Sequence, residues 1–144
     1  MKKLYFTLAL LFFIGASYAQ ILNPVKLSYS AIKKGKNLYE VHIKTTIDNK
    51  WHLYSVSNPE GGAIATEIKY GNGDGVGAVK EKGAMKTVFE KEFKMNQKFY
   101  EKNVEFVQNV KLKSGTSLNG TITYMVCNDR QCLPPKDVDF SIKL

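Results

Sequence analysis

Apolar and polar residues alternate along much of this chain, and a period of two is typical of β-strands that bury one face. Four stretches follow the pattern most clearly, with mostly polar residues at the intervening positions. Their apolar positions are Tyr39, Val41, Ile43 and Ile47; Val104, Phe106, Val110 and Leu112; Ile122, Tyr124 and Val126; and Val138, Phe140, Ile142 and Leu144. Weaker strands are predicted over residues 26–30, 51–56, 65–70 and 87–93.

Turn-forming residues separate these predicted strands, and no stretch beyond the first twenty residues carries the apolar stripe of an amphipathic helix. Many short strands between turns are typical of a β-sandwich. We therefore predict an all-β fold, an immunoglobulin-like β-sandwich. The turn signals lie at residues 33–37, 48–49, 58–62, 71–75, 114–115 and 119–120.

The first nineteen residues have the pattern of a secretory signal peptide. Lys2 and Lys3 precede an apolar run over residues 4–14, and Ser17-Tyr18-Ala19 supplies the small residues of a cleavage site. The run is shorter than the roughly 20 apolar residues that span a bilayer. We expect residues 1–19 to be removed, leaving one domain over residues 20–144 in the periplasm, with no membrane span in the mature chain.

The chain is basic, with a formal net charge of +8 over its 144 residues. Its lysines are scattered among acidic residues instead of forming one block, which is typical of a solvated surface. We therefore do not expect nucleic acid to be a partner.

Three other motifs have alternative interpretations. The glycine-rich residues 71–75 lack the helix of a dinucleotide-binding loop and the carboxylates of a calcium loop, so we interpret them as a flexible turn. Asn119-Gly120-Thr121 fits a glycosylation site, but Asn-Gly before a strand favours a hairpin turn. His42 and His52 are far from the cysteines in sequence, and we predict no metal site and no cofactor.

Cys127 and Cys132 are the only cysteines, and four residues separate them. In an exported protein such a pair forms a disulfide or exchanges one. A disulfide that closes so short a loop stabilises the fold by only about 2 kcal/mol in the loop-entropy model. A disulfide between these cysteines would therefore contribute little to stability, whereas two neighbouring thiols can cycle between dithiol and disulfide. Spacing and compartment alone leave both interpretations open.

The segment Thr121-Ile122-Thr123-Tyr124-Met125-Val126-Cys127-Asn128-Asp129-Arg130-Gln131-Cys132-Leu133-Pro134-Pro135 resembles the active-site region of the N-terminal periplasmic domain of the thiol:disulfide interchange protein DsbD. Two upstream pieces resemble that family in the same order. Trp51-His52-Leu53-Tyr54 is similar to its aromatic strand near the cysteines, and Phe99-Tyr100 is similar to its cap loop. The family fold is an immunoglobulin-like sandwich.

The resemblance implies a component of a protein-disulfide reductase that passes reducing equivalents. The donor would be a thioredoxin-like domain or a DsbD-like membrane protein, and the acceptors would be a periplasmic disulfide isomerase or a cytochrome c maturation thioredoxin. Cys132 would form the mixed disulfides and Cys127 would resolve them. His52, Tyr54, Phe99 and Tyr100 would surround the pair.

The chain also departs from the family. It has one residue fewer between its cysteines than the best-known members, and Gln97 and Lys98 replace acidic residues before the cap aromatic. The alternative function is an exported immunoglobulin-like binding module with a purely structural disulfide. We further expect Phe99 to lie in a polar loop over residues 96–103, either as a plug of the core or as a lid over the cysteines.

Overall fold

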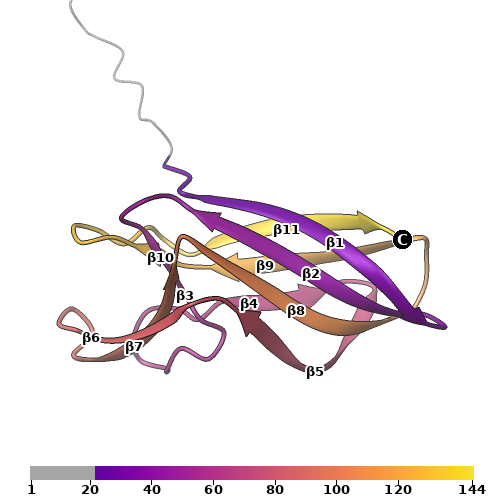
Figure 1. The fold of residues 1–144 in the computed structure, drawn as a ribbon, viewed down its shortest axis with the longest axis horizontal. Helices are drawn as coiled ribbons and strands as arrows, with labels where there is room; N and C mark the ends of the chain where they lie inside the picture. The colour runs from indigo at the N-terminus through magenta and orange to yellow at the C-terminus, as the bar shows by residue number, and fades with distance from the viewer. Residues whose placement is uncertain (1–21) are drawn as a thin grey trace, which may run out of the picture.

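The computed structural model describes residues 22–144, so the predicted signal peptide over residues 1–19 lies outside the described residues. This part of the chain is built of strands and contains no helix, which confirms the all-β prediction (Figure 1). In chain order the strands are β1 (Val25–Gly35), β2 (Leu38–Ile47), β3 (His52–Tyr54), β4 (Glu67–Tyr70), β5 (Gly73–Lys82), β6 (Met85–Glu90), β7 (Met95–Glu101), β8 (Asn103–Leu112), β9 (Ser117–Tyr124), β10 (Val126–Cys127) and β11 (Lys136–Lys143).

The strands form three antiparallel sheets. Their orders are β1-β2-β8-β5, here called sheet A; β10-β3-β7-β6, called sheet B; and β11-β9-β4, called sheet C. Tyr29 of β1 stacks on Phe140 of β11 with ring centroids 4.9 Å apart, so sheets A and C pack against each other. Sheet B lies at one end of the molecule, at the left of Figure 1.

Sheets A and B are two parts of one long bent ribbon. β2 pairs with β8 in sheet A, and the continuations of these strands, β3 and β7, pair in sheet B. Lys50 and Lys102 lie at the two bends with positive φ angles of 71° and 67°. Backbone of this kind is uncommon in non-glycine residues and allows a sharp change of direction. Beyond the bend, His52 in β3 and Phe99 in β7 belong to sheet B.

The predicted alternation is confirmed in the strongest strands. Val41, Ile43, Thr45 and Ile47 of β2 are buried, while the residues that alternate with them are exposed or half-buried. The same pattern buries Ile122 and Tyr124 in β9. These side chains belong to one apolar core that draws on all three sheets.

Three local predictions were wrong. Residues 95–101 form β7 instead of a polar loop, because the amide of Gln97 is fully buried and hydrogen-bonded by Asn58. Residues 73–75 lie in β5 instead of a flexible turn. Asn119 and Gly120 lie inside β9 instead of a hairpin turn, because they pair with β11 and Gly120 also pairs with Tyr70 of β4. The backbone of Lys69 and the ring of Phe140 leave no room for a side chain at Gly120.

Side chains of β3, β7 and β10 are buried on both faces of sheet B, and each face carries a different cluster, whereas the edge strand β6 is largely exposed. Leu53 and Tyr100 point to the main core. Tyr54, Phe99 and Cys127 point to the other side and form a small cluster with Ala63. Because successive side chains of a strand point to opposite faces, Phe99 and Tyr100 must separate in this way.

Candidate functional site

Cys127 and Cys132 form a disulfide at the end of β10, with their Cα atoms 4.0 Å apart. The loop between them is ordered by Asn128, whose side-chain oxygen accepts hydrogen bonds from the backbone N–H groups of Arg130 and Gln131, both at 2.9 Å. The backbone N–H of Leu133 donates to the carbonyl of Val126 at 2.9 Å. An Asn side chain that bonds its own backbone in this way produces a tight turn. The local sequence therefore folds so that the two cysteines meet.

The two sulfur-bearing residues differ in exposure. Cys127 is 2% exposed and belongs to the small cluster of sheet B, whereas Cys132 lies in the exposed part of the loop. Thiol–disulfide exchange requires the attacking sulfur to reach the sulfur that it attacks. An incoming protein sulfur can therefore approach Cys132 more easily than Cys127.

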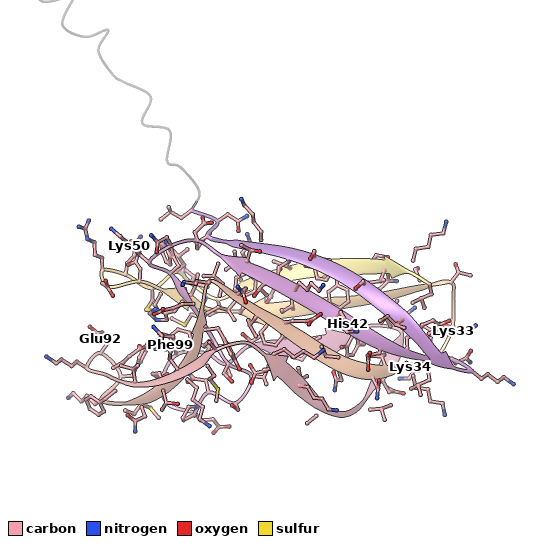
Figure 2. The ribbon with its side chains drawn as sticks, in the orientation of Figure 1. Lys33, Lys34, His42, Lys50, Glu92 and Phe99 are labelled. Carbon is pink, nitrogen blue, oxygen red and sulfur yellow. A yellow bond between two sulfur atoms is a disulfide. The ribbon has the colours of Figure 1, made fainter. Side chains whose placement is uncertain are left out.

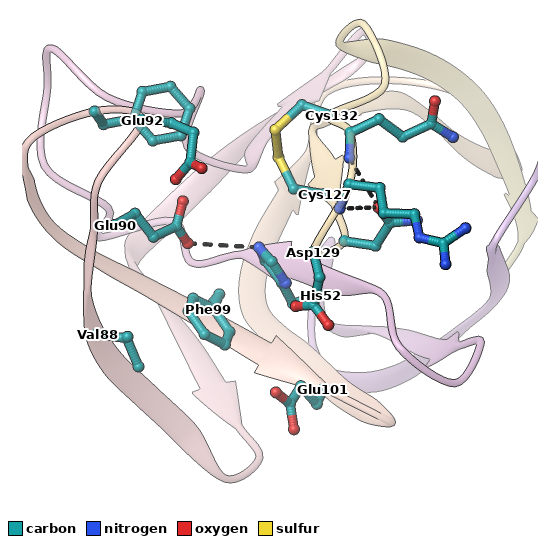
Figure 3. Close-up of a pocket in the computed structure, with 13 residues that line it drawn as sticks. His52, Val88, Glu90, Glu92, Phe99, Glu101, Cys127, Asp129 and Cys132 are labelled. Carbon is teal, nitrogen blue, oxygen red and sulfur yellow. Dashed lines mark hydrogen bonds and ion pairs between the residues drawn. A yellow bond between two sulfur atoms is a disulfide. The ribbon is translucent and has the colours of Figure 1, made fainter.

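A cavity of about 410 Å³ lies beside the disulfide and is lined by both cysteines (Figure 3). Four carboxylates surround it although the chain as a whole is basic, and Arg130 is the one lining residue with a permanent positive charge. Negative charge near a thiol disfavours its thiolate. The carboxylates are those of Glu90, Glu92, Glu101 and Asp129.

His52, Tyr54 and Glu90 form a hydrogen-bonded group beside this cavity; His52 and Glu90 line it, and the fully buried Tyr54 lies behind them. The hydroxyl of Tyr54 donates to the Glu90 carboxylate at 2.9 Å, and Nε2 of His52 lies 3.1 Å from that hydroxyl. Nε2 also lies 3.5 Å from a Glu90 oxygen, the pair that Figure 3 joins with a dashed line. The chain brings β3 and β6 together at this point through β7.

Burial shifts the pKa values of all three groups. It lowers the pKa of His52, and the nearby carboxylates of Glu101 and Asp129 oppose that effect. It raises the pKa of Glu90, which the hydrogen bond from Tyr54 partly opposes. It also raises the pKa of Tyr54 far above its ordinary value, so the phenol stays protonated and remains a donor.

Phe99 lies in β7 and lines the same cavity as both cysteines. It pairs with Tyr54 across the sheet, and its ring packs against that of His52 with centroids 4.3 Å apart and an angle of 31° between the ring planes. It is 6% exposed. The structure thus brings His52, Tyr54 and Phe99 to the disulfide. Tyr100 is buried in the main core on the opposite face of sheet B and does not line the cavity.

Sequence reasoning missed two residues that line this cavity, Glu90 and Phe93. Residues 87–93 were predicted as one strand, whereas β6 ends at Glu90 and residues 91–94 form a turn. Phe93 is half-buried in that turn and packs against the small cluster. A single aromatic among charged residues, in Glu90-Lys91-Glu92-Phe93-Lys94, was the available signal.

The loop between β3 and β4 packs against the small cluster that borders the cavity. The Nδ2 group of Asn58 donates to the carbonyl of Ala63 and to Oε1 of Gln97, both at 2.8 Å. The backbone N–H of Ala63 also donates to Gln97 at 3.0 Å. These bonds satisfy buried polar groups and hold Ala63 against Tyr54, Phe99 and Cys127.

His42 lies on β2 of sheet A, well away from Phe99 in Figure 2. Nδ1 of His42 lies 2.8 Å from a Glu105 oxygen and Nε2 lies 3.2 Å from Glu40, so its ring is held between carboxylates instead of being freely solvated. Within residues 22–144, no three side chains of the metal-ligating types converge. Nor does a helix long and apolar enough to cross a membrane occur in that part of the chain.

Comparison with known families gives one match over nearly the whole chain. The model of the family described as thiol:disulfide interchange protein DsbD, N-terminal, matches residues 19–143. No curated protein sequence matches the chain.

Solved structures of similar shape include three domains. The N-terminal periplasmic domain of ScsB from Proteus mirabilis has a TM-score of 0.60 at 20% identity, covering 83% of this chain and 45% of that one. The reduced DsbD N-terminal domain from Neisseria meningitidis has a TM-score of 0.55 at 20% identity, covering 85% and 90%. The complex of the DsbD and PilB N-terminal domains from Neisseria meningitidis gives 0.58 at 19% identity, covering 85% and 87%.

These likenesses establish a shared immunoglobulin-like fold, as the strand pattern predicted. The chain spans less than half of the ScsB chain that it matches.

Proposed function

The chain belongs to the family of the N-terminal domain of the thiol:disulfide interchange protein DsbD, and from that premise we propose that it passes reducing equivalents between proteins through Cys127 and Cys132. The observation that carries the proposal is the disulfide itself. It joins residues so close in sequence that it stabilises the fold little, and it lines an open cavity. A structural bridge has no need of such access.

The unequal exposure of the two cysteines supports different roles for them. Cys132 is the thiol that exchanges with partner proteins, because it lies in the exposed loop. Cys127 is the resolving thiol, because its burial keeps it from partner sulfurs but leaves it in contact with Cys132. Resolution within one molecule is fast because the two sulfurs are already neighbours.

The partners follow from the family and from one solved complex. The Neisseria meningitidis DsbD N-terminal domain forms a complex with the PilB N-terminal domain, so this fold can receive a second protein domain. The donor for this chain is a thioredoxin-like domain or a DsbD-like membrane protein. The acceptor is a periplasmic disulfide isomerase or a cytochrome c maturation thioredoxin. Export by the signal peptide over residues 1–19 delivers the chain to that compartment.

The aromatic residues beside the disulfide limit which molecules reach it. Phe99 is held in the middle of a paired strand, so it forms a fixed wall that covers Cys127. Phe93 is half-buried in the turn over residues 91–94, beyond the last paired residues of β6 and β7. Opening of this turn would admit a partner, as loops at other active sites do.

Mixed-disulfide trapping tests the proposal. The variant Cys127→Ser should accumulate a covalent complex with an oxidised thioredoxin-like domain, because Cys132 attacks and this chain has no second thiol to resolve the product. The variant Cys132→Ser should accumulate little, and the native chain should accumulate none. Equal trapping by both variants would contradict the assigned roles, and trapping by neither would contradict exchange.

The reduction potential separates this function from a binding module with a structural disulfide. An exchanging pair should equilibrate with thioredoxin-like proteins, near about −270 mV. A structural bridge typically lies below about −300 mV and resists them.

A further inference from the structure

His52 is the ionisable side chain directly opposite Cys127 in sheet B. The two residues are paired across β3 and β10, and Glu101 is paired with His52 on its other side. Directly paired residues of antiparallel strands place their side chains on the same face, with Cβ atoms about 5 Å apart. The imidazole therefore lies on the same face of sheet B as the side chain of the buried cysteine, whereas Cys132 comes from the exposed loop.

The hydrogen bonds around His52 determine which of its nitrogens carries the proton. The hydroxyl of Tyr54 has one proton and gives it to the Glu90 carboxylate. Its contact with His52 therefore needs a donor on the ring, so Nε2 carries a hydrogen. The contacts of the ring to polar groups in the described part of the chain all involve Nε2. Nδ1 is then the unprotonated nitrogen, with a lone pair free to accept a proton.

This arrangement has the logic of a base oriented by a carboxylate. In such sites the carboxylate holds the tautomer of the imidazole and stabilises the imidazolium that forms when the base accepts a proton. Here Glu90 does so directly and through Tyr54. Phe99 packs against the imidazole at a ring-plane angle of 31° and limits its rotation.

The buried cysteine needs such a base. An ordinary cysteine thiol has a pKa of about 8.5 and is mostly protonated near pH 7, so it has to lose a proton when it attacks. Four carboxylates and one arginine line the cavity beside Cys127. Cys127 is also 2% exposed, which limits its contact with hydroxide from solvent.

We propose that His52 is the proton acceptor and donor for Cys127 during exchange, with Tyr54 and Glu90 as its positioning residues. The proposal rests on the proposed function of the disulfide. In the resolving step, Nδ1 takes the proton of the Cys127 thiol while that sulfur attacks Cys132 Sγ in a mixed disulfide. The Cys127–Cys132 bond forms, the bond from Cys132 to the acceptor breaks, and the acceptor sulfur leaves as a thiolate with the electron pair. The pair is oxidised, the acceptor is reduced, and the imidazolium passes its proton to water.

The reverse step uses the same groups. When a donor thiolate attacks Cys132 Sγ, the Cys127–Cys132 bond breaks and Cys127 leaves with the electron pair. The His52 imidazolium then returns a proton to that thiolate. Several charged groups face the imidazole and influence this transfer: Glu101 from β7, Glu90 from β6, and Asp129 and Arg130 from the cysteine loop.

The experiment uses the reduced protein and an excess of a chromogenic aryl disulfide. Cys132 attacks the reagent and releases one aryl thiolate, at a rate that rises with reagent concentration. Cys127 then attacks Cys132 and releases the second aryl thiolate, at a rate independent of that concentration. The second phase therefore reports the step that needs His52, and no partner protein is required.

The informative variant is His52→Phe, which keeps a ring on Phe99 and removes the base. Its second phase should be slower than that of the native chain by at least tenfold near pH 7, since a positioned base contributes roughly 10²–10⁴-fold. Its first phase should be unchanged. The matched control is His42→Phe, which alters the other histidine of the chain on the far sheet and should leave both phases unchanged.

The pH profile distinguishes a base from a packing residue. Burial lowers the pKa of His52, so the native second phase should rise to a plateau below the ordinary histidine pKa of about 6.5. The variant should instead rise steadily toward the thiol pKa. The second phase of Glu90→Gln should be several-fold slower than that of the native chain but still present.

A native-like second phase and pH profile in His52→Phe would overturn the proposal. If that variant does not fold, His52→Ala with added imidazole replaces it, and failure of imidazole to accelerate the second phase would equally overturn it. Failure of the proposed function looks different, because mixed disulfides with thioredoxin-like domains would then be absent while both phases persist.

Discussion

Phe99→Ala is the substitution that best tests how the site is built. Phe99 is 6% exposed and packs in a cluster with Tyr54, Ala63 and Cys127. Truncation of a buried Phe to Ala costs 3–5 kcal/mol, of which burial of the ring accounts for roughly 1.5–3 kcal/mol and the cavity for the rest. The cluster is small and borders an open cavity, so water can enter the gap. We therefore expect the lower end, about 3 kcal/mol.

The free energy of unfolding is measured by urea denaturation of the oxidised protein. For a domain of this size, about 3 kcal/mol should lower the melting temperature by roughly 10 °C. Phe89→Ala is the matched control, because Phe89 lies nearby in β6 but is 60% exposed. That control should change stability by about 0.5 kcal/mol or less.

Alkylation of the reduced cysteines provides the second measurement. Phe93→Ala should leave stability within about 1 kcal/mol and accelerate alkylation, because Phe93 is half-buried in a turn. Phe99→Ala should change both quantities. A loss of less than about 1 kcal/mol in Phe99→Ala would refute the description of Phe99 as a fixed wall and would favour a mobile lid at that position.

Four further predictions follow from other parts of the structure. Gly62→Ala should lower stability by about 2 kcal/mol in thermal unfolding, because a Cβ atom there would collide with the buried amide of Gln97; an unchanged melting temperature would contradict that packing. Burial raises the pKa of Glu90, so the native chain loses stability as pH rises from about 4.3, the ordinary pKa of a glutamate, through the folded pKa of Glu90. Glu90→Gln should therefore be more stable than the native chain at pH 7 but not at pH 4. A stability difference that does not change with pH would contradict the shift. Reduction of the disulfide should lower the free energy of unfolding by only about 2 kcal/mol, because the closed loop is short. Circular dichroism measures this, and a protein that unfolds when it is reduced would indicate a structural disulfide instead. The intact mass of the exported protein should correspond to a chain that begins at Gln20, and a mass that includes Met1 would contradict cleavage after Ala19.

Local pattern was sufficient where the determining interactions are local. Alternation in β2 and β9 predicted both the strands and their buried faces, because one face of each strand meets the apolar core. The cysteine pair was recognisable because its members are neighbours in sequence and need only a tight turn to meet. The resemblance to the DsbD family added the identity of that pair, and the family match over residues 19–143 agrees with it.

Tertiary structure decided the features that depend on remote partners. Asn96-Gln97-Lys98 looks like a loop in sequence, but Gln97 can be buried in a strand because Asn58, some forty residues away, satisfies its side chain. The glycines at 73 and 75 look like turn residues, but they lie in β5 because they pair with Leu112 and Val110 of β8. Neighbouring side chains leave no room for a Cβ atom at either position.

The site itself combines both kinds of information. Sequence supplied His52, Tyr54 and the two cysteines, but not Glu90, which only the pairing of β6 with β7 brings beside β3. Nor could sequence assign Phe99 to the cavity and Tyr100 to the core, because that choice depends on which face of β7 turns inward. A one-residue change in strand register would exchange the two faces, and the register is determined by packing of the whole sheet.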